Sequence, residues 1–188
     1  MKKIWLIRHG ETEGNRERRY IGITDEPLNK AGRRQAELLC LPKVGAVYTS
    51  PMKRCTETAA ILFPDVKPIV CQNLRECHFG VFEGKTAEEM AEEPRYLRWV
   101  ETGCTEDIPG GESVSDFKER CCAAFTAAVA DSSAAKMAFV IHGGCIMAIL
   151  ERFEGSRSFY EYHIGNGKAV LCQMDDNGRL HISGGILC

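Results

Sequence analysis

Short runs of apolar residues recur along the chain, separated by longer polar or mixed segments. Runs without polar alternation are typical of strands that are covered on both faces of a sheet. The first run stops at Arg8-His9-Gly10, and a later one stops in the same way at His142-Gly143-Gly144. The pattern predicts strands at residues 4–7, 44–48, 69–71, 137–141, 169–174 and 180–182.

Between these runs the apolar residues take helical spacing. Ser50 and Pro51 offer an N-cap and a first-turn proline, so one helix is expected to start at Pro51. Ser113 is expected to cap another, which keeps helical spacing from Val114 to Val129. Further helices are predicted at residues 31–41, 87–92, 95–101 and 145–153. The expected inward faces are Ala31, Gln35, Leu38 and Leu39 in the helix at 31–41, and Cys55, Ala59, Leu62 and Phe63 in the helix that starts at Pro51.

Strands that alternate with helices predict an α/β fold, a three-layer α/β/α sandwich with a mainly parallel sheet. The last two strands are separated by residues 175–178, where Asn177-Gly178 favours a tight primed turn and a closing hairpin. Residues 73–111 are less periodic, and we expect them to form a helical insertion over the functional site. The whole chain, 1–188, is expected to be a single domain.

Composition narrows the possible partners. The chain has 188 residues and a formal net charge of −2, with 24 Lys and Arg against 26 Asp and Glu. It therefore lacks a global positive field for nucleic acid or anionic lipid, and any bound anion must be held locally. The apolar run at residues 4–7 is too short for a signal peptide, and no run approaches the roughly 20 residues of a membrane span. We expect a cytoplasmic protein with neither a membrane nor a nucleic-acid partner.

Ten cysteines are dispersed along the chain without a CxxC pair. Most lie in apolar runs, as Cys71 and Cys172 do, which favours reduced, buried side chains that pack like small hydrophobic residues. Cys55, Cys77 and Cys145 neighbour segments of the candidate site, and packing is the expected role for them as well.

Residues suited to phosphate follow three of the predicted strands: Arg8 and His9, Arg54, and His142. Parallel strands bring their carboxyl ends to one edge of the sheet, where ligands of such folds bind. The glycines after each histidine, Gly143 among them, allow backbone N–H groups to approach an oxyanion, and the helix at Pro51 adds the positive end of its dipole. The sequence therefore predicts an anion site at this edge.

The residue types point to phosphoryl transfer. Arginine donates two parallel hydrogen bonds to a phosphoryl group and stays charged, which suits Arg8 and Arg54 to binding. Histidine is largely neutral and nucleophilic near pH 7, so His9 is the candidate nucleophile, and His142 is expected to donate a hydrogen bond to the phosphoryl oxygens. Glu76 is the candidate acid for the leaving group, although Glu83, in a glycine-flanked loop, could compete for that role.

Several motifs follow one another in a fixed order along most of the chain. Together they resemble the histidine phosphatase superfamily, the phosphoglycerate mutase-like proteins, and a set of ordered motifs is far more specific than any one of them. The motifs are residues 6–15 (LIRHGETEGN), 22–28 (GITDEPL), 50–59 (SPMKRCTETA), 74–76 (LRE), 79–84 (FGVFEG), 109–113 (PGGES) and 142–144 (HGG).

The resemblance implies a role for each matching residue. His9 would be phosphorylated, and Glu76 would protonate the leaving group and later activate water. The residues implied to bind phosphate or substrate are Arg8, Asn15, Gly22, Ile23, Thr24, Arg54, His142 and Gly143. No metal and no cofactor are implied, which agrees with the residues themselves, because two guanidiniums and two imidazoles can neutralise a phosphoryl group without magnesium.

The expected reaction is hydrolysis of a small phosphomonoester. Phosphoglycerate mutases of this superfamily have a longer segment after the catalytic glutamate, paired arginines for a substrate carboxylate, and a C-terminal tail that excludes water. Here residues 76–112 form a short segment, Arg95 and Arg98 are not adjacent, and the chain ends at Ile186-Leu187-Cys188. Water is therefore expected to reach the phosphoenzyme.

The motifs at residues 79–84 and 109–113 are most similar to the α-ribazole-5'-phosphate phosphatase branch of cobalamin synthesis, although Phe82 stands where that branch often has tryptophan. Phosphoglycerate mutase and phosphoserine or broad-specificity phosphatase are alternatives that use the same chemistry. A non-catalytic module that binds a phosphorylated ligand is an alternative of another kind. Such a module has no need of an acid such as Glu76.

Overall fold

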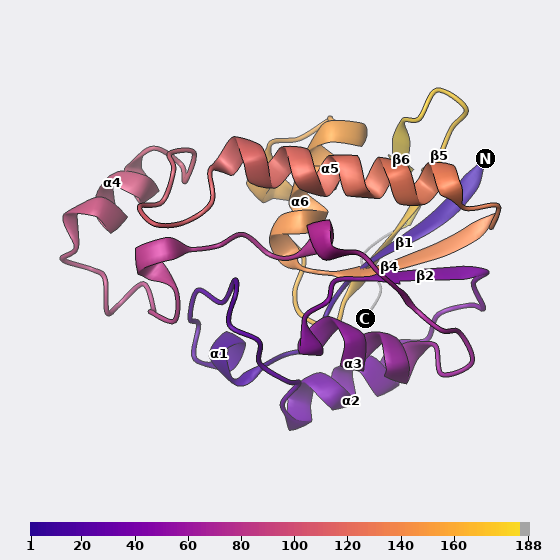
Figure 1. Ribbon diagram of the computed structural model, residues 1–188, viewed down its shortest axis with the longest axis horizontal. Coiled ribbons are helices and arrows are strands. Elements are labelled where there is room, and N and C mark those ends of the chain that lie inside the picture. The colour runs from indigo at the N-terminus through magenta and orange to yellow at the C-terminus, as the bar shows by residue number, and fades with distance from the viewer. Residues whose placement is uncertain (185–188) are drawn as a thin grey trace.

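The structure, a computed structural model, describes residues 1–184 and contains a six-stranded sheet in the order β3-β2-β4-β1-β5-β6 (Figure 1). Strands β3, β2, β4 and β1 are parallel, whereas β5 is antiparallel to β1 and β6 is antiparallel to β5. This confirms the mainly parallel sheet and its closing hairpin. The strands are β1 (Lys2–Arg8), β2 (Ala46–Thr49), β3 (Ile69–Val70), β4 (Lys136–Ile141), β5 (Ala169–Met174) and β6 (Leu180–Ile182).

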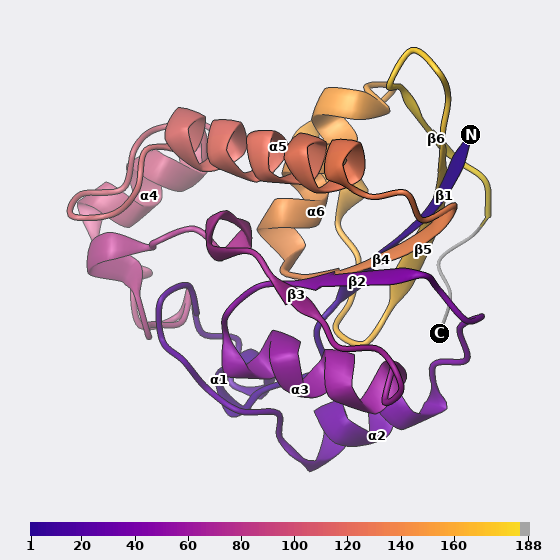
Figure 2. The ribbon, with the colours of Figure 1, turned by 45° about the vertical axis from the view of Figure 1, so that its right-hand side comes forward.

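Helices cover both faces of the sheet, so the predicted three-layer α/β/α sandwich is confirmed. Helices α2 and α3 lie on one face and α5 and α6 on the other, in both views (Figures 1 and 2). The α-helices are α1 (Glu13–Arg16), α2 (Lys30–Leu38), α3 (Lys53–Leu62), α4 (Pro94–Glu101), α5 (Val114–Asp131) and α6 (Gly143–Phe153), and 3-10 turns occupy Gln72–Leu74, Gly80–Phe82 and Phe159–Tyr162. Within residues 1–184, no helix has the length and apolar character needed to cross a bilayer.

The first strand shows why its sequence lacks polar alternation. Successive side chains of a strand point to opposite faces, and here each face is covered by helices. Ile4 and Leu6 join the core beneath α5 and α6, whereas Trp5 and Ile7 join the core beneath α2 and α3. These four side chains are at most 4% exposed. Burial on both sides fixes β1 in the centre of the sheet and thereby fixes the position of the residues that follow it.

Helix α3 begins two residues later than the Ser50-Pro51 pair predicts. Its N-cap is Met52, which makes no side-chain cap, and Ser50 Oγ instead lies 2.7 Å from Nε2 of His142. The backbone N–H of Lys53 donates to Asp25 at 2.7 Å, so a residue distant in sequence caps the helix. Cys55 and Ala59 are fully buried, as expected, and Phe63 lies at the end of the same face.

Two other predicted helices are corrected. Residues 87–92 form turns, although Thr86 and Glu89 make the reciprocal bonds of a capping box. The bonds that follow, from Met90 to Ala87 and from Ala91 to Glu88, reach back only three residues, and Pro94 starts a separate helix, α4. Helix α2 ends at Leu38, whose side chain is 56% exposed, while Leu39 turns inward. The buried face of α2 consists of Gly32 and Ala36, because this helix packs closely on the loop after β1, where a Cβ at Gly10 would lie 2.4 Å from the Gly32 carbonyl oxygen.

The β5–β6 hairpin forms with a different turn. A type I′ turn needs positive φ at both central residues and a type II′ turn needs it at the first, but of Asn177 and Gly178 only the second, Gly178, has it, at +78°. The Asp175 carboxylate accepts hydrogen bonds from the backbone N–H groups of Asn177 and Arg179, both at 2.9 Å. This Asx-type bonding stabilises the longer turn.

Only some of the cysteines are buried. Cys55, Cys77, Cys121, Cys145 and Cys172 are buried, but Cys40 is exposed in the loop after α2. The expectation of buried cysteines is therefore wrong for Cys40, and Cys71, Cys104 and Cys122 are only partly buried. Cys188, with the rest of 185–188, lies outside the described residues, as does the chain end invoked above for water access.

The carboxyl ends of β1, β2 and β4 meet at one edge of the sheet. Helix α1, helix α4 and the irregular residues around them gather beyond this edge (Figures 1 and 2). Residues 73–112 contain one α-helix, α4, and otherwise form 3-10 turns, bends and loops. The fold thus places an irregular segment over the strand ends that carry the candidate residues.

Candidate active site

His9 follows β1 and is only 3% exposed. Its Nδ1 lies 2.7 Å from the carbonyl oxygen of Gly10, and a carbonyl can only accept, so Nδ1 carries the proton. Burial, and next the charge of Arg54, hold the pKa of His9 well below its usual value, so the ring is neutral near pH 7. A neutral ring with its proton on Nδ1 leaves a lone pair on Nε2.

Arg54 lies in the first turn of α3 and is almost completely buried. Its Nη1 and Nη2 donate to the carbonyl oxygens of Thr24 and Gly22 at 2.7 and 2.9 Å, and its Nε donates to Nδ1 of His142 at 3.3 Å. A guanidinium has five N–H groups, so two are not used in these bonds. The loop at residues 22–24 therefore orients Arg54 and leaves it donors for a ligand.

His142 follows β4 and is fully buried, with its ring centroid 5.1 Å from that of His9. Because Nδ1 accepts from Arg54, the neutral ring carries its proton on Nε2, which lies 2.7 Å from Ser50 Oγ. Burial, followed by the charge of Arg54, lowers the pKa of His142 well below its usual value. Both ring nitrogens thus have protein partners, and donation to a phosphoryl group requires that the 3.3 Å contact with Arg54 gives way.

Arg8 ends β1 and lines a cavity. Its Nη1 donates to the carbonyl oxygen of Ile164 at 2.7 Å and lies 3.1 Å from Nε2 of His163, while its Nε has no partner among the described residues. A Cβ at Gly143 would lie 3.3 Å from the Arg8 guanidinium carbon, a tight contact that would shift the guanidinium by a few tenths of an ångström.

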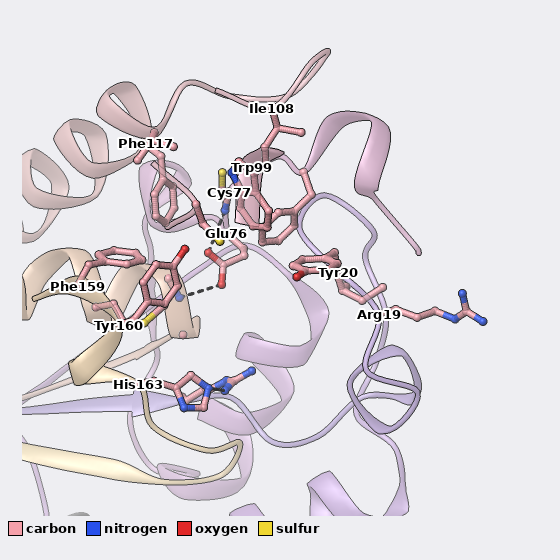
Figure 3. Close-up of a pocket in the computed structure, with 18 of the residues that line it drawn as sticks. Arg19, Tyr20, Glu76, Cys77, Trp99, Ile108, Phe117, Phe159, Tyr160 and His163 are labelled. Carbon is pink, nitrogen blue, oxygen red and sulfur yellow. Dashed lines mark hydrogen bonds between the residues drawn. The ribbon is translucent and has the colours of Figure 1, made fainter. Parts of the chain in front are cut away.

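Glu76 lines the same cavity, and Figure 3 shows it between aromatic side chains. Its Oε2 accepts from the backbone N–H of Gly144 at 3.1 Å, and its Oε1 accepts from that of Cys77 at 3.0 Å. A Cβ at Gly144 would lie 2.3 Å from Oε1. The two glycines after His142 therefore make room for two different functional side chains, Arg8 and Glu76.

Both carboxylate oxygens of Glu83, the other candidate acid, already accept hydrogen bonds from other residues. Its Oε1 accepts from the N–H of Gly22 and from the N–H and hydroxyl of Thr24, at 2.9 to 3.0 Å, and its Oε2 accepts from the N–H of Phe79 at 3.3 Å. Glu83 is not among the residues that line the cavity. Its contacts brace the loop that holds Arg54.

The remaining expected binding residues lie either at the cavity or in the loop that contacts Arg54. Asn15 lines the cavity, and its Oδ1 accepts from Asn166 Nδ2 at 3.0 Å. Gly22 and Thr24 contact Arg54 through their carbonyl oxygens, and the Ile23 side chain is 54% exposed. Among the residues expected in the site, the cavity is lined by Arg8, Asn15, Glu76 and Gly143, while His9, Arg54 and His142 lie buried beside Arg8.

The cavity has a volume of about 270 Å³ and a largely aromatic wall (Figure 3). The sequence motifs do not include most of this wall, since Trp99 belongs to α4 and Phe159 and Tyr160 follow α6. Two buried side-chain donors lack a partner in residues 1–184, Arg8 Nε and Trp99 Nε1, and both residues line this cavity. The aromatic residues are Tyr20, Phe79, Trp99, Phe117, Phe159 and Tyr160.

No three His, Cys, Asp or Glu side chains among the described residues form a set that could hold a metal ion. His163 lies against Arg8 at the cavity wall. Burial and the charge of Arg8 lower the pKa of His163, so its ring is neutral near pH 7.

The family model described as "Histidine phosphatase superfamily (branch 1)" matches residues 4–182. The chain belongs to the histidine phosphatase superfamily. This branch 1 protein is 34% identical over 161 residues to "Phosphoglycerate mutase-like protein 4" of Arabidopsis thaliana, covering 80% of this chain and 70% of the relative. It is 32% identical over 185 residues to "Putative phosphoserine phosphatase 2" of Hydrogenobacter thermophilus, covering 93% and 91%.

Solved structures of this superfamily resemble the chain over nearly its whole length. The alpha-ribazole phosphatase from Shigella flexneri has a TM-score of 0.85 and 24% identity, covering 96% of this chain and 95% of that one. A phosphoglycerate mutase from Thermus thermophilus has a TM-score of 0.76 and 32% identity, covering 99% and 98%. The first likeness shows the shared fold, and the activities for which these proteins are named differ.

Proposed function

We propose that this histidine phosphatase superfamily member hydrolyses phosphomonoesters in two steps, through a phosphohistidine at His9. The observation that carries the proposal is the tautomer of His9, fixed by the 2.7 Å bond from Nδ1 to the Gly10 carbonyl oxygen. This bond leaves the Nε2 lone pair available, and burial beside Arg54 keeps the ring neutral. A neutral, oriented imidazole is a competent nucleophile for phosphorus.

In the first step, Nε2 of His9 forms a bond to phosphorus while the ester P–O bond breaks and its electron pair passes to the leaving oxygen. Glu76, entering as the carboxylic acid, gives its proton to that oxygen. N–H groups that make no bond within the described residues, among them the Nε of Arg8 and two on Arg54, bind the phosphoryl oxygens. These donors are already in place, so they need little reorganisation as charge develops.

In the second step, the Glu76 carboxylate takes a proton from water, and the water oxygen attacks phosphorus. The P–N bond breaks, its electron pair returns to Nε2, and inorganic phosphate leaves. Glu76 is again the acid form, ready for the next substrate. Glu76 supports both steps because it is the cavity-lining glutamate, whereas the oxygens of Glu83 accept from Gly22, Thr24 and Phe79.

We propose hydrolysis rather than mutase activity because the cavity offers little to a substrate carboxylate. Its basic residues are Arg8, Arg19 and His163. The first is assigned to phosphate, the second is bonded to Glu17, Glu89 and the Gly84 carbonyl oxygen, and the third is neutral. Phosphoglycerate and phosphoserine both carry a carboxylate, so both would leave it without a cationic partner.

The leaving group that fits the cavity carries an uncharged aromatic ring. Aromatic side chains bind flat ligands through their faces and edges, and the Trp99 N–H without a partner can donate to a polar atom of such a ligand. α-Ribazole 5'-phosphate, the kind of substrate for which the Shigella flexneri neighbour is named, combines a phosphate with an aromatic base and is the proposed substrate. The reaction would then serve cobalamin synthesis.

Turnover of a substrate panel tests the proposal. The panel contains α-ribazole 5'-phosphate, phosphoserine, phosphoglycerates and para-nitrophenyl phosphate, with phosphate release and phosphoenzyme formation measured together. We expect the highest kcat/KM for α-ribazole 5'-phosphate, an acid-labile phosphate on His9, and no turnover by His9→Ala. An active His9→Ala variant would refute the mechanism, and a higher kcat/KM for phosphoserine would refute the substrate.

The alternatives predict other results from the same panel. A mutase interconverts phosphoglycerates without net phosphate release. A binding module turns over none of the esters and keeps its phosphate affinity in Glu76→Gln. Either pattern would replace the proposed function.

A further inference from the structure

Arg120 of α5 donates three hydrogen bonds to the segment that carries Glu76. Its Nη1 donates to the carbonyl oxygens of Asn73 and Arg75 at 2.9 and 2.8 Å, and its Nη2 donates to that of Glu76 at 3.0 Å. One side chain thus holds three carbonyl groups within four residues. The Arg120 side chain is only 15% exposed.

Glu112 completes this arrangement. It accepts from Nε and Nη2 of Arg120 at 2.5 and 2.7 Å, in a bidentate ion pair. Its own backbone N–H donates to the carbonyl oxygen of His78 at 3.0 Å. We call Arg120 and Glu112 the clamp, because they bind the chain both before and after Cys77.

Arg54, near the nucleophile, and Arg120, near the acid, differ in how many guanidinium N–H groups they leave unbonded. Arg54 uses three of its five N–H groups, which leaves two for phosphate. Arg120 uses all five, on Glu112 and on three carbonyl groups, and it does not line the cavity. It therefore has no donor for a ligand and can act on the reaction only through the residues it holds.

The segment needs such a clamp because it has little regular structure. After the 3-10 turn at Gln72–Leu74, residues 75–79 belong to no helix or strand. The Glu76 side chain rests on Gly144 of α6, and its backbone is held from α5 by Arg120. Without Arg120, three carbonyl groups would lose a charged partner, and the carboxylate would lose the fixed backbone from which it projects.

We propose that the clamp positions Glu76 for proton transfer to the leaving group. The proposal rests on the proposed function, because it assumes that Glu76 is the acid of the first step. Proton transfer in the transition state depends on placement within hydrogen-bond reach, so a small displacement of the carboxylate weakens it while nucleophile and phosphate donors stay in place. Arg120 is thus a positioning residue whose loss mimics part of the loss of Glu76.

A pair of esters with different leaving groups tests this. The para-nitrophenolate ion leaves without a proton, whereas the alkoxide of phenethyl phosphate needs one, and both esters present an aromatic ring to the cavity. The readout is the ratio of kcat/KM for the two esters, nitrophenyl over phenethyl, which reports phosphoryl transfer to His9 and is independent of how much protein is folded. General-acid catalysis is worth ~10²- to 10⁴-fold, so Glu76→Gln should raise the ratio by about that much.

The variants are Arg120→Lys, Arg120→Gln and Glu112→Gln. We expect Arg120→Gln to raise the ratio by at least ~10-fold and Arg120→Lys and Glu112→Gln to raise it less, because each retains part of the clamp. In the Glu76→Gln background, Arg120→Gln should not raise it further, since both changes act on one proton transfer. The matched control is Arg33→Gln, which breaks an Arg–Glu pair between α2 and α3 (Arg33 to Glu57, 2.7 Å) and should leave the ratio unchanged.

Equal losses on both esters in Arg120→Gln, or an unchanged ratio at full activity, would overturn the proposal. So would a further rise of the ratio in the double variant. Failure of the proposed function gives a different result, because wild-type protein would then form no phosphohistidine from either ester. Arg120→Lys keeps the test open if Arg120→Gln does not fold.

Discussion

The strand ends and the segment above them contribute to one site in different ways. At the strand ends, which we call the floor (Arg8, His9, Arg54 and His142), buried polar groups bond to backbone carbonyls or to each other at 2.7 to 3.3 Å. In residues 73–112, which we call the cap, the side chains toward the cavity are mainly apolar, and the N–H of Trp99 has no partner in residues 1–184.

This difference separates the reaction from the choice of substrate. The floor residues follow strands of a sheet that is buried on both faces, so their positions are determined by the core. The cap contains one short helix and turns, and most of its buried apolar residues form a cluster separate from the two cores of the sheet: Phe82, Met90, Tyr96, Trp99 and Ile108. Glu76 belongs to both regions, because its backbone lies in the cap and its carboxylate rests on Gly144 at the floor.

Gly144→Ala breaks the contact between the two regions and should have the largest effect. The new Cβ would lie 2.3 Å from Oε1 of Glu76, so the carboxylate must move. Because the acid step is worth ~10²- to 10⁴-fold, we expect kcat/KM for phenethyl phosphate to fall toward that range, with a smaller loss for para-nitrophenyl phosphate. Steady-state kinetics on the two esters measure this.

The control for this substitution is Gly184→Ala, where a Cβ would meet nothing within 4 Å among residues 1–184. It should match wild type on both esters. If Gly144→Ala also matches wild type, the carboxylate position seen here is not the one used for proton transfer.

Titration tests the two floor histidines, together with His163, whose pKa is also lowered. Burial lowers the pKa of both His9 and His142 below the unfolded value of ~6.5, so below that pH the unfolded chain takes up protons that the folded chain does not. The free energy of unfolding should therefore fall as the pH decreases, by up to about 1.4 kcal/mol per pH unit for each histidine. Urea denaturation between about pH 7 and pH 5, without phosphate, measures the slope.

Replacing either histidine with Gln should reduce this slope by the contribution of one proton. A wild-type slope in both floor variants would mean that neither ring is neutral in the folded protein.

Glu83→Gln tests the contacts by which Glu83, in the cap, holds the loop at residues 22–24 that orients Arg54 at the floor. Glutamine can keep the acceptor for Gly22 and Thr24 but loses the charge and the bond from Phe79, so the loop that orients Arg54 weakens. We expect ~10-fold lower kcat/KM, by the same factor for both esters, because Arg54 acts on the phosphoryl group that they share. A changed ratio of the two esters would instead give Glu83 a part in proton transfer.

The sequence was sufficient to place the floor because local patterns determine it. The apolar runs that end at Arg8-His9 and at His142 predict strands, and parallel strands bring their ends together whatever the loops do. The fold, its layers and the closing hairpin follow from the same patterns. Even here, the bond between Ser50 and His142 was not predicted, because a serine before a proline equally favours a helix cap.

The cap could not be predicted to the same degree because contacts distant in sequence decide its structure. Thr86 and Glu89, which precede a helix-like stretch that forms turns, both contact Arg19 in a distant loop, and Arg120 holds Glu76 from a helix 44 residues away. Trp99 has apolar neighbours at helical spacing and gives no sign that it faces a cavity rather than the core. Short irregular segments carry too little periodicity to fix such contacts.

Trp99→Phe changes only the cap, and we expect it to have the smallest effect of these substitutions. It keeps an aromatic ring in the wall and removes the N–H that has no partner in the described chain. A neutral hydrogen bond contributes about 0.5–1.5 kcal/mol, so kcat/KM for α-ribazole 5'-phosphate should fall by ~2- to 10-fold. Phenethyl phosphate, which has no acceptor beyond its phosphate, should be turned over as before.

Tyr96→Phe is the control, because that hydroxyl bonds to Tyr20 at 3.1 Å and Tyr96 does not line the cavity. Equal losses on the two substrates in Trp99→Phe would show that the indole contributes only its bulk to the wall, and the selectivity of the cap would then rest on the shape of its aromatic rings alone.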